Sequence, residues 1–359
     1  MKFKEYKLEE IINCFDNKRK PLSSLQRQKI KGIYPYYGAQ EIIDYIDRYI
    51  FDGKYLILAE DGENLRSNVK PLVKLIDGKF WINNHAHIFQ TNEKCKIEYL
   101  YYALLKTNIK PFITGTTQPK LNQSNMLKIR VKIPNVYNQN KIVKILETID
   151  RKISNNTQTN NNLYEIGLSL IEEEYNSINK TEKLQNIIQF TKGKKPVKIV
   201  KYKDKNYDKY LTIACLNYQE LNYANKEKMI LAQNDILMVM DGASSGEVYY
   251  SDCGIVGSTF ARIDIINKIF TKEYMFFILK KCTDLIKTKN TGSAIPHADK
   301  AFINLLSVPI LSIENQKKYC IILKKIQQNE HKIRNLMIIR DTLLPKLING
   351  EIDLDKIEI

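Results

Sequence analysis

The sequence lacks the motifs that carry chemistry in several large enzyme classes. Its 14 glycines never occur as Gly-x-Gly, which excludes the usual loop of dinucleotide-binding and methyl-donor-binding folds, and no P-loop is present. No Pro-Pro or Asn-Pro pair occurs either. This removes the Asn/Asp-Pro-Pro-aromatic segment with which DNA amino-methyltransferases hold a flipped base. We therefore expect no catalytic residue and no cofactor-binding residue in this chain.

Paired cysteines and long apolar runs are also missing. The six cysteines lie far apart and form no Cys-x-x-Cys pair, so neither a zinc site nor a disulfide framework is expected, and a reducing cytoplasm is favoured. No stretch of 18 apolar residues exists and the N-terminus is charged, so we expect no membrane span and no signal peptide. His85 and His87 could supply two metal ligands from one strand face. No third ligand is indicated, so no metal site is expected.

Acidic residues are too few to balance the basic ones. The chain has 56 Lys+Arg against 40 Asp+Glu and a formal net charge of +16. Such an excess favours a polyanionic partner, because each basic side chain placed at a phosphate releases condensed counterions. Lysine, asparagine and isoleucine are all plentiful, as AT-rich genomes tend to produce. Part of the positive charge could therefore reflect codon bias and lie on a solvated surface, with no role in binding. Both explanations of the charge stay open.

One pattern occurs twice in the chain. Thr114-Gly115 recurs as Thr291-Gly292, and Gln139 recurs as Gln316, at the same offset (291 − 114 = 177). A period this long is not that of a solenoid repeat. It predicts a duplicated unit of globular domain followed by long helix.

The two long helices are expected at residues 138–178 and 313–350. Apolar residues recur along both at steps of three and four, which marks one stripe per helix, and Gly350 is a stop signal. A stripe on a helix roughly 50 Å long needs a partner, so we expect an antiparallel coiled coil with pseudo-two-fold symmetry that acts as a spacer between the domains. The polar run from Ser154 to Asn162 interrupts the first stripe. It favours the alternative in which each helix packs only on its own domain.

The two globular copies are residues 1–137 and 179–312, and residues 351–359 form a tail. Each copy mixes short strand patterns with helical stretches, which include Ile97–Lys106 in the first copy and Lys272–Lys281 in the second. The Asp-Gly turns include Asp61-Gly62 and Asp241-Gly242, one in each copy. The predicted fold class is therefore α+β, with two duplicated mixed domains joined by the two helices.

Candidate DNA contacts are basic, aromatic, amide, imidazole and hydroxyl side chains, which position phosphates and read base edges. In the first copy they are Lys18, Arg19, Lys20, Tyr36, Tyr37, Trp81, Asn84, His85, His87, Thr116, Gln118 and Lys120. In the second they are Lys192, Lys194, Lys195, Ser244, Ser245, Ser258, Thr259, Arg262, Ser293 and His297. The framework is shared while these side chains differ, as expected for two readers of different sequences. Tyrosines in the first set could instead be core, and the segments at 114–120 and 291–297 could be ordinary turns.

The whole chain resembles the DNA-specificity subunit of type I restriction–modification enzymes. The residues that carry the resemblance are Tyr36-Tyr37-Gly38-Ala39, Glu60-Asp61-Gly62, the segment from Trp81 to His87, Asn234 to Leu237, Asp241-Gly242, Glu314 to Lys318, and Leu343 to Glu351. The first helix departs from the pattern at its polar middle and at Gly167.

The resemblance implies a non-catalytic subunit that recognises a DNA sequence. Each of two target-recognition domains would enter the major groove of double-stranded DNA at one half of a split, asymmetric site, and the coiled coil would measure the gap. Two modification subunits would bind S-adenosylmethionine and methylate a flipped adenine, and restriction subunits that use ATP and Mg²⁺ could join them.

Other functions remain open. A similar chain could serve a modification-only or phage-exclusion system. A stand-alone duplex-binding regulator would need no enzyme partner, and it should bind its site tightly by itself.

Overall fold

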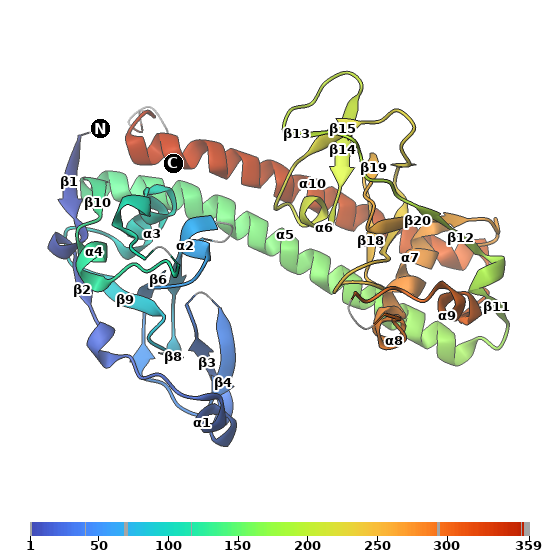
Figure 1. Cartoon of the computed structure of the whole chain (residues 1–359), viewed down its shortest axis with the longest axis horizontal. Helices are drawn as coiled ribbons and strands as arrows, with labels where there is room; N and C mark the ends of the chain where they lie inside the picture. The colour runs from blue at the N-terminus through green and yellow to red at the C-terminus, as the bar shows by residue number, and fades with distance from the viewer. Residues whose placement is uncertain are drawn as a thin grey trace. The chain divides into compact units, whose positions relative to one another are not determined.

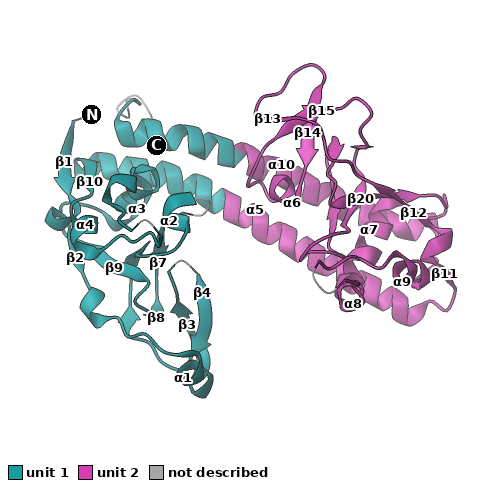
Figure 2. Ribbon diagram, in the orientation of Figure 1, with its two compact units in different colours: residues 1–152, 336–359 teal, residues 153–335 magenta. Residues whose placement is uncertain are grey.

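A computed structural model describes residues 2–39, 41–67, 71–115, 117–292, 295–352 and 354. The chain divides into two compact units (Figures 1 and 2). Unit 1 comprises residues 1–152 and 336–359, and unit 2 comprises residues 153–335. Among the described residues, no helix combines the length and the apolar character that crossing a membrane requires. The candidate contacts Thr116 and Ser293 lie outside the described residues.

Unit 1 contains two four-stranded sheets and a strand pair. The order of the first sheet is β2 (Ile12–Cys14), β9 (Ala86–Thr91), β6 (Tyr55–Ala59) and β7 (Val73–Ile76), with all pairs antiparallel. The second sheet is β4 (Ile42–Ile46), β3 (Lys31–Tyr37), β8 (Lys79–Ile82) and β5 (Phe51–Asp52), in which β3 and β8 are parallel. Strand β1 (Phe3–Lys7) pairs with β10 (Arg130–Pro134).

Strand β6 is apolar throughout because both of its faces are covered. Leu56 and Leu58 point into a core shared with helix α3 (Ile97–Lys106), while Ile57 between them points into the core on the opposite face. Successive side chains of a strand alternate between faces, so a strand between two cores must be apolar at every position.

Unit 2 repeats this topology and adds a strand, β13, at one edge of its second sheet. Its first sheet is β12 (Ile188–Lys192), β20 (Phe260–Ile265), β17 (Ile236–Val239) and β18 (Val248–Tyr250). The second is β13 (Ile199–Val200), β15 (Tyr223–Asn225), β14 (Tyr207–Leu211), β19 (Gly254–Val256) and β16 (Leu231–Ala232), with β14 and β19 parallel. Strand β11 (Thr181–Lys183) pairs with β21 (Ser307–Pro309), and helix α7 (Lys272–Lys281) takes the place of α3. The expected duplicated α+β fold is confirmed.

The long helices are α5 (Val136–Ser177) and α10 (Ile313–Asn349). Both begin after a capping side chain at equivalent positions. Asn135 accepts a hydrogen bond from the backbone N–H of Asn138 at 2.9 Å, and Ser312 accepts one from the N–H of Asn315 at 3.2 Å. Such caps satisfy N–H groups that have no partner within the first helical turn.

Helix α10 ends at the predicted glycine. Gly350 has φ +76°, its N–H donates to the carbonyl of Leu347 at 3.3 Å, and the N–H of Glu351 donates to that of Lys346 at 2.8 Å. This is a Schellman arrangement, which needs a residue that tolerates the left-handed conformation.

The helices run antiparallel within each unit. In unit 1, Arg340 of α10 donates to Asp150 of α5 at 3.1 Å, while Lys141, earlier in α5, reaches the carbonyl of Leu354 beyond the end of α10. In unit 2, Asn160 meets Asn329 at 2.9 Å, and Glu174, later in α5, accepts from Tyr319. The helices therefore contact each other as well as their domains.

The polar run of α5 contributes one residue to the helix interface of unit 2. Asn160 accepts a hydrogen bond from Asn329 and donates to the carbonyl of Ile326 at 3.3 Å. Both asparagines are buried. A buried amide pair favours the one register in which both partners are satisfied.

Gly167 allows α5 to approach α7 closely. A Cβ atom at this position would lie 2.2 Å from a ring carbon of Phe277. The departure from the helix pattern at Gly167 therefore reflects close packing within unit 2.

Candidate nucleic-acid interface

Two candidate residues of unit 1, His85 and Lys120, lie beside the chain that leaves strand β6. Glu60 and Asp61 follow this strand directly, and the N–H of Glu60 donates to the carbonyl of His85 at 2.9 Å. Asp61 Oδ2 lies 2.8 Å from His85 Nδ1. Lys120 pairs with Glu60 through its ammonium at 3.3 Å and forms a backbone bridge with Asp61. Residues 60–61, 85 and 120, which are far apart in the sequence, thus form one cluster of loop residues, termed the loop cluster of unit 1.

Arg19 connects the segments of this cluster through its mostly buried guanidinium. Its guanidinium donates to the carboxylate of Glu60 and to the carbonyl of Ala86, both at 2.7 Å, and to the carbonyl of Asn84 at 3.4 Å. It also lies 3.3 Å from the carboxylate of Asp16, and its side chain is only 14% exposed. Arg19 therefore positions the loop that carries Asn84 and His85, and its engaged guanidinium does not support the expected direct contact with DNA.

His87 is fully buried, with both ring nitrogens engaged. Nδ1 lies 2.6 Å from Asp16 and Nε2 lies 2.7 Å from the carbonyl of Leu121. Burial works to raise the pKa of Asp16, but the hydrogen bond and charge of His87, the backbone N–H of Ile88 and the charge of Arg19 outweigh it, so the pKa is lowered. His87 cannot reach DNA from this position.

Asp16, Glu60 and His87 bring three potential ligand atoms within metal-binding distance of one another. They do not fit a metal ion in this structure. Both carboxylates are paired with Arg19, and both nitrogens of His87 are hydrogen-bonded to oxygens. A metal would need a deprotonated ring nitrogen and free carboxylate oxygens. The cluster is therefore a partly buried network of ion pairs, and the pair of metal-ligating histidines considered from the sequence does not form.

Four further candidates are buried and contribute to packing. The indole N–H of Trp81 donates to the carbonyl of Lys20 at 2.6 Å, and the Tyr36 hydroxyl accepts from the N–H of Leu22 at 2.8 Å. Tyr37 lies in the core between the sheets of unit 1, and Ser245 is covered and bonded to Asn290. Direct DNA contact by these side chains is not supported, because none is exposed.

Unit 2 carries an equivalent loop cluster around Asp241. Asp241 Oδ1 lies 2.8 Å from His297 Nδ1, and its other oxygen pairs with Lys192. Burial works to raise the pKa of Asp241, while the hydrogen bonds and charges of Lys192 and His297 lower it, with a net lowering. Arg262 is occupied by Asp264 and by the carbonyl of Leu231, at 2.7 and 2.6 Å. Arg262 therefore links β20 to Leu231 of β16 from a partly exposed position.

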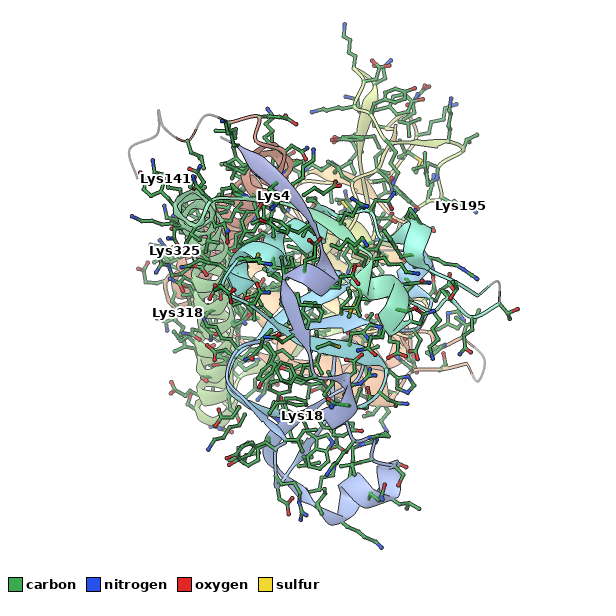
Figure 3. All side chains as sticks on the ribbon, turned by 90° about the vertical axis from the view of Figure 1, so that its left-hand side faces the viewer. Lys4, Lys18, Lys141, Lys195, Lys318 and Lys325 are labelled. Carbon is green, nitrogen blue, oxygen red and sulfur yellow. The ribbon has the colours of Figure 1, made fainter. Side chains whose placement is uncertain are left out.

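The exposed candidates are mostly lysines and polar loop residues. In unit 1 they are Lys18, Lys20, Asn84, His85, Gln118 and Lys120, and in unit 2 they are Lys192, Lys194, Lys195, Thr259 and His297. Ser244 and Ser258 are half-buried. Figure 3 shows the side chains of Lys18 and Lys195 projecting from the ribbon. Among the exposed lysines, Lys120 in unit 1 and Lys192 in unit 2 lie beside an Asp–His pair with an exposed ring.

Comparison with known proteins identifies the family. The type I restriction modification DNA specificity domain matches the chain twice, at residues 1–165 and 176–337. The chain belongs to this family of DNA specificity subunits.

Relatives of the specificity subunit are similar over part of their length. A putative type I restriction enzyme specificity subunit of Haemophilus influenzae is 37% identical over 142 residues, which are 40% of this chain and 36% of that protein. The type I restriction enzyme MjaVIII specificity subunit of Methanocaldococcus jannaschii is 32% identical over 145 residues, 39% of this chain and 34% of that protein. The matched stretches span about a third of the length of these curated relatives.

A solved structure shares the fold of the specificity subunit. The crystal structure of the S subunit of a type I restriction–modification system from M. genitalium superimposes with a TM-score of 0.61. It covers 97% of this chain and 96% of that chain at 17% identity.

The acidic residues of the loop clusters are not among the contacts expected from the sequence. Asp16, Glu60, Asp61 and Asp241 each hold a cation or a histidine in place. A signal for two of them was present, since Asp61-Gly62 of the first copy recurs as Asp241-Gly242 of the second. Their partners could not be found in this way, because His85 and His297 come from different elements.

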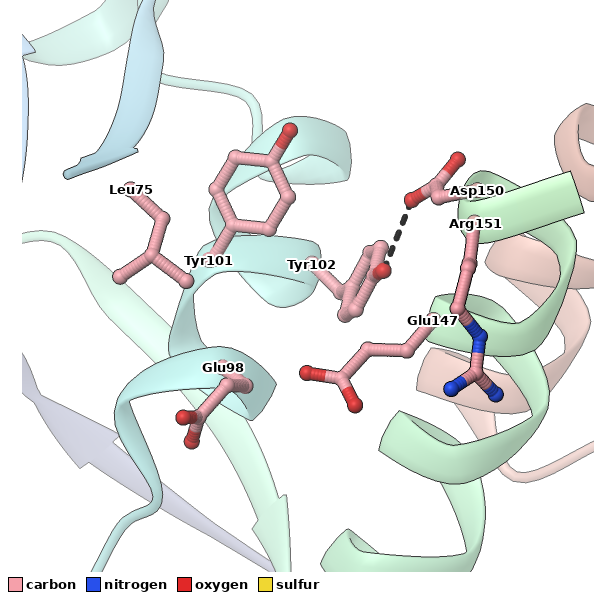
Figure 4. Close-up of a pocket in the computed structure, with 7 residues that line it drawn as sticks. All are labelled: Leu75, Glu98, Tyr101, Tyr102, Glu147, Asp150 and Arg151. Carbon is pink, nitrogen blue, oxygen red and sulfur yellow. Dashed lines mark hydrogen bonds between the residues drawn. The ribbon is translucent and has the colours of Figure 1, made fainter. Parts of the chain in front are cut away.

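A separate cavity of about 370 Å³ lies in unit 1 between α3, β7 and α5 (Figure 4). Tyr102 donates to Asp150 at 2.7 Å on one side, and the carboxylate of Glu147 extends into the space from α5. Glu98 adds a third carboxylate to the lining. Arg151 adds a guanidinium to the lining, and Glu98 and Asp150 are paired with Lys54 and Arg340, so the lining carries charges of both signs.

Proposed function

We propose that this specificity subunit recognises a split, asymmetric site on double-stranded DNA, one half with the loop cluster of each unit. The observation that carries the proposal is that both units have the same backbone framework but expose different side chains on it. The same strand order and the same Asp-Gly turn support both clusters, yet their exposed side chains differ. Asn84 and His85 precede β9 in unit 1, whereas Ser258 and Thr259 precede β20 in unit 2. Different side chains on one frame suit the recognition of different bases.

The charges of the clusters support a DNA partner. Lys18 and Lys20 flank the buried Arg19 in unit 1, and Lys194 and Lys195 follow β12 in unit 2, all four with exposed side chains. Cations at the rim of a cluster would contact phosphates and set the register of the duplex, while the loop side chains face the base edges.

The chemistry would belong to partner subunits. We propose that two modification subunits bind S-adenosylmethionine and methylate an adenine in the recognised site, that restriction subunits using ATP and Mg²⁺ join them where the system restricts DNA, and that the complex works in the cytoplasm. The specificity subunit would supply sequence selection and would have no catalytic residue of its own. The family membership of the chain supports this division of labour.

The test is to express the chain together with the modification subunits of its system in a host that lacks the system, and to map methylated adenines across the genome. One new split motif should appear, and it should vanish when the chain is left out. If the subunits methylate the same motif without the chain, or if no motif appears although the complex assembles, the proposal is wrong.

A charge-matched pair of variants tests the cluster itself. Lys194→Gln with Lys195→Gln should weaken binding of the complex to all DNA, and should reduce the slope of log affinity against log salt by up to about 2. Lys4→Gln with Lys132→Gln removes the same charge from the β1–β10 strand pair and should leave that slope nearly unchanged. Equal effects of both double variants would count against the cluster as the DNA-facing surface.

A further inference from the structure

Within the described part of the chain, the loop cluster of each unit has one aspartate–histidine pair whose ring is exposed. One pair is Asp61 with His85, and the other is Asp241 with His297. In both, a carboxylate oxygen lies 2.8 Å from Nδ1 of the ring. The aspartates are equivalent members of the repeated Asp-Gly turn. The histidines are not equivalent, because His85 precedes strand β9 and His297 precedes helix α9 (Lys300–Leu305).

The backbone frames around the pairs are the same even though the histidines differ in origin. Lys120 forms mutual backbone hydrogen bonds with Thr114 and a bridge with Asp61. At an offset of 177 residues, His297 forms mutual hydrogen bonds with Thr291 and a bridge with Asp241 (297 − 120 = 177). The two units therefore form the same Asp–His pair on the same backbone frame, but a different segment supplies the histidine in each unit.

The aspartate determines which ring nitrogen carries the proton. A carboxylate can only accept, so Nδ1 of the neutral imidazole must donate to it, and Nε2 is left as an acceptor. The side chains of His85 and His297 are 53% and 50% exposed, whereas those of the aspartates are 29% and 30% exposed. Among the residues that the structure describes, none hydrogen-bonds to either Nε2 atom. When its ring is neutral, each pair thus presents one oriented acceptor to solvent.

We propose that His85 and His297 are specificity-determining residues whose Nε2 atoms accept a hydrogen bond from the amino group of adenine or cytosine in the major groove. Asp61 and Asp241 are positioning residues that fix the ring and its tautomer. In the major groove, adenine N6 and cytosine N4 are donors at the base edge, whereas guanine presents N7 and O6 and thymine presents O4 as acceptors. The proposal rests on the proposed function, since it assigns one base to each loop cluster.

The neighbouring charges favour this role over a phosphate contact. Around His85, Lys120 and Arg19 are balanced by Glu60 and Asp61. Around His297, Asp241 is shared with Lys192. A carboxylate beside the ring repels an approaching phosphate, and the exposed lysines of each cluster are better placed to neutralise the backbone. A hydrolytic role would need a nucleophile, and no described hydroxyl or thiol hydrogen-bonds to either Nε2.

The experiment uses the complex with two modification subunits and maps its methylation motif for each variant. His85→Ala should make one position degenerate in one half of the site, with about tenfold loss of discrimination there and the other half unchanged. His297→Ala should do the same in the opposite half. His85→Gln, whose amide oxygen can also accept from the amino group, should retain most of the preference.

The role of Asp61 is tested by the base preference of the motif, which would not change if Asp61 only stabilised the fold. In Asp61→Asn the amide can donate to Nδ1 as well as accept from it, so both tautomers occur and Nε2–H can donate to guanine or thymine. The motif should keep its original base at that position and admit these two in addition. An unchanged motif in Asp61→Asn would show that Asp61 does not position the ring.

His331 provides the matched control. It is a 61% exposed histidine on α10 whose nearest carboxylate, that of Asp252, is 3.7 Å away. His331→Ala should leave every base of the motif unchanged. The proposal is overturned if His85→Ala and His297→Ala also leave the motif unchanged, or if they weaken binding to all sequences equally. A wild-type complex that produces no split motif would instead overturn the proposed function.

Discussion

Gln139 and Gln316 make the same three hydrogen bonds in the two units. Each is fully buried near the start of a long helix, accepts from the backbone N–H of the residue before a domain helix, and donates to two backbone carbonyls. The partners are Lys96, Lys94 and Pro134 for Gln139, and Thr271, Ile269 and Leu311 for Gln316, at 2.7–3.2 Å. Each glutamine therefore fastens its domain to its long helix.

Replacing Gln139 with leucine should destabilise unit 1 by about 1–3 kcal/mol, because the N–H of Lys96 and the buried carbonyl of Pro134 lose their partner. Gln316→Leu should cost unit 2 a similar amount. The single tryptophan, Trp81, lies in unit 1, so urea unfolding followed by its fluorescence reports on that unit. Asn140→Leu, at an exposed neighbouring position of the same helix, is the control. A shift for Gln139→Leu no larger than the control's would show that the hydrogen bonds contribute little.

Gly167→Ala should destabilise unit 2 although alanine is the better helix former. Alanine would gain roughly 1 kcal/mol of helix propensity, but its Cβ would lie 2.2 Å from the ring of Phe277. The resulting displacement should cost more than that gain, typically about 1–3 kcal/mol. Thermal unfolding by circular dichroism measures the change. Ser169→Ala, exposed on the same helix, should be neutral or slightly stabilising. A Gly167→Ala protein as stable as the wild type would disprove the close approach.

Glu330 should make unit 2 less stable as the pH rises. Burial, with the nearby charge of Asp252, raises the pKa of Glu330 from 4.5 to about 7, and Arg334 and Tyr164 offset this only in part. A carboxyl whose pKa is higher in the folded state favours folding fully below about pH 4.5 and loses this contribution as the pH passes through about 7. The loss is at most on the order of 3 kcal/mol.

Glu330→Gln should therefore match the wild type in stability near pH 4.5 and exceed it near pH 8. Urea unfolding at both values measures the difference. Glu165→Gln, at an exposed position of α5, changes the same charge and should show no such trend. A difference between Glu330→Gln and the wild type that is the same at both pH values would contradict the burial of this carboxyl.

The length of the long helices should set the distance between the half-sites. Four residues inserted after Lys152 in α5 and four after Asn335 in α10 fall where the chain passes between the units, so the contacts inside each unit stay intact. One added turn of about 5.4 Å should favour a spacer longer by one or two base pairs, since B-DNA advances about 3.4 Å per base pair. Mapping of methylated sites measures the spacer. A single-helix insertion should lower activity by breaking the register, and an unaltered spacer with full activity in the double insertion would mean that the helices do not set the gap.

Periodicity and repetition predicted most of the fold. The stretches Ile97–Lys106 and Lys272–Lys281, singled out as helical from their pattern, are α3 and α7 with the same bounds. Helix α5 begins two residues before the expected start at 138, because the cap is Asn135. These features depend on neighbours in sequence or on the repeat offset, both of which are visible in the chain alone.

The candidate site was harder to predict, because its geometry depends on which side chains face inward. Tyr36, Trp81 and His87 have the chemistry of DNA contacts, yet strand alternation and the packing of two sheets bury them. The pairing of Asp61 with His85 joins residues 24 positions apart across a turn, and no local pattern specifies it. Residue type indicated the segments correctly but could not separate the residues that support a loop from those that it exposes.

Exchanging one domain for a copy of the other tests most directly whether each unit recognises its own half-site. Residues 1–134 are replaced by a copy of residues 178–311, so that both segments end just before the capping residues Asn135 and Ser312. The complex of this chain with the modification subunits should methylate a motif in which both halves carry the sequence that unit 2 recognises in the wild type. An asymmetric motif that still contains the half-site of unit 1 would contradict recognition of one half-site by each unit.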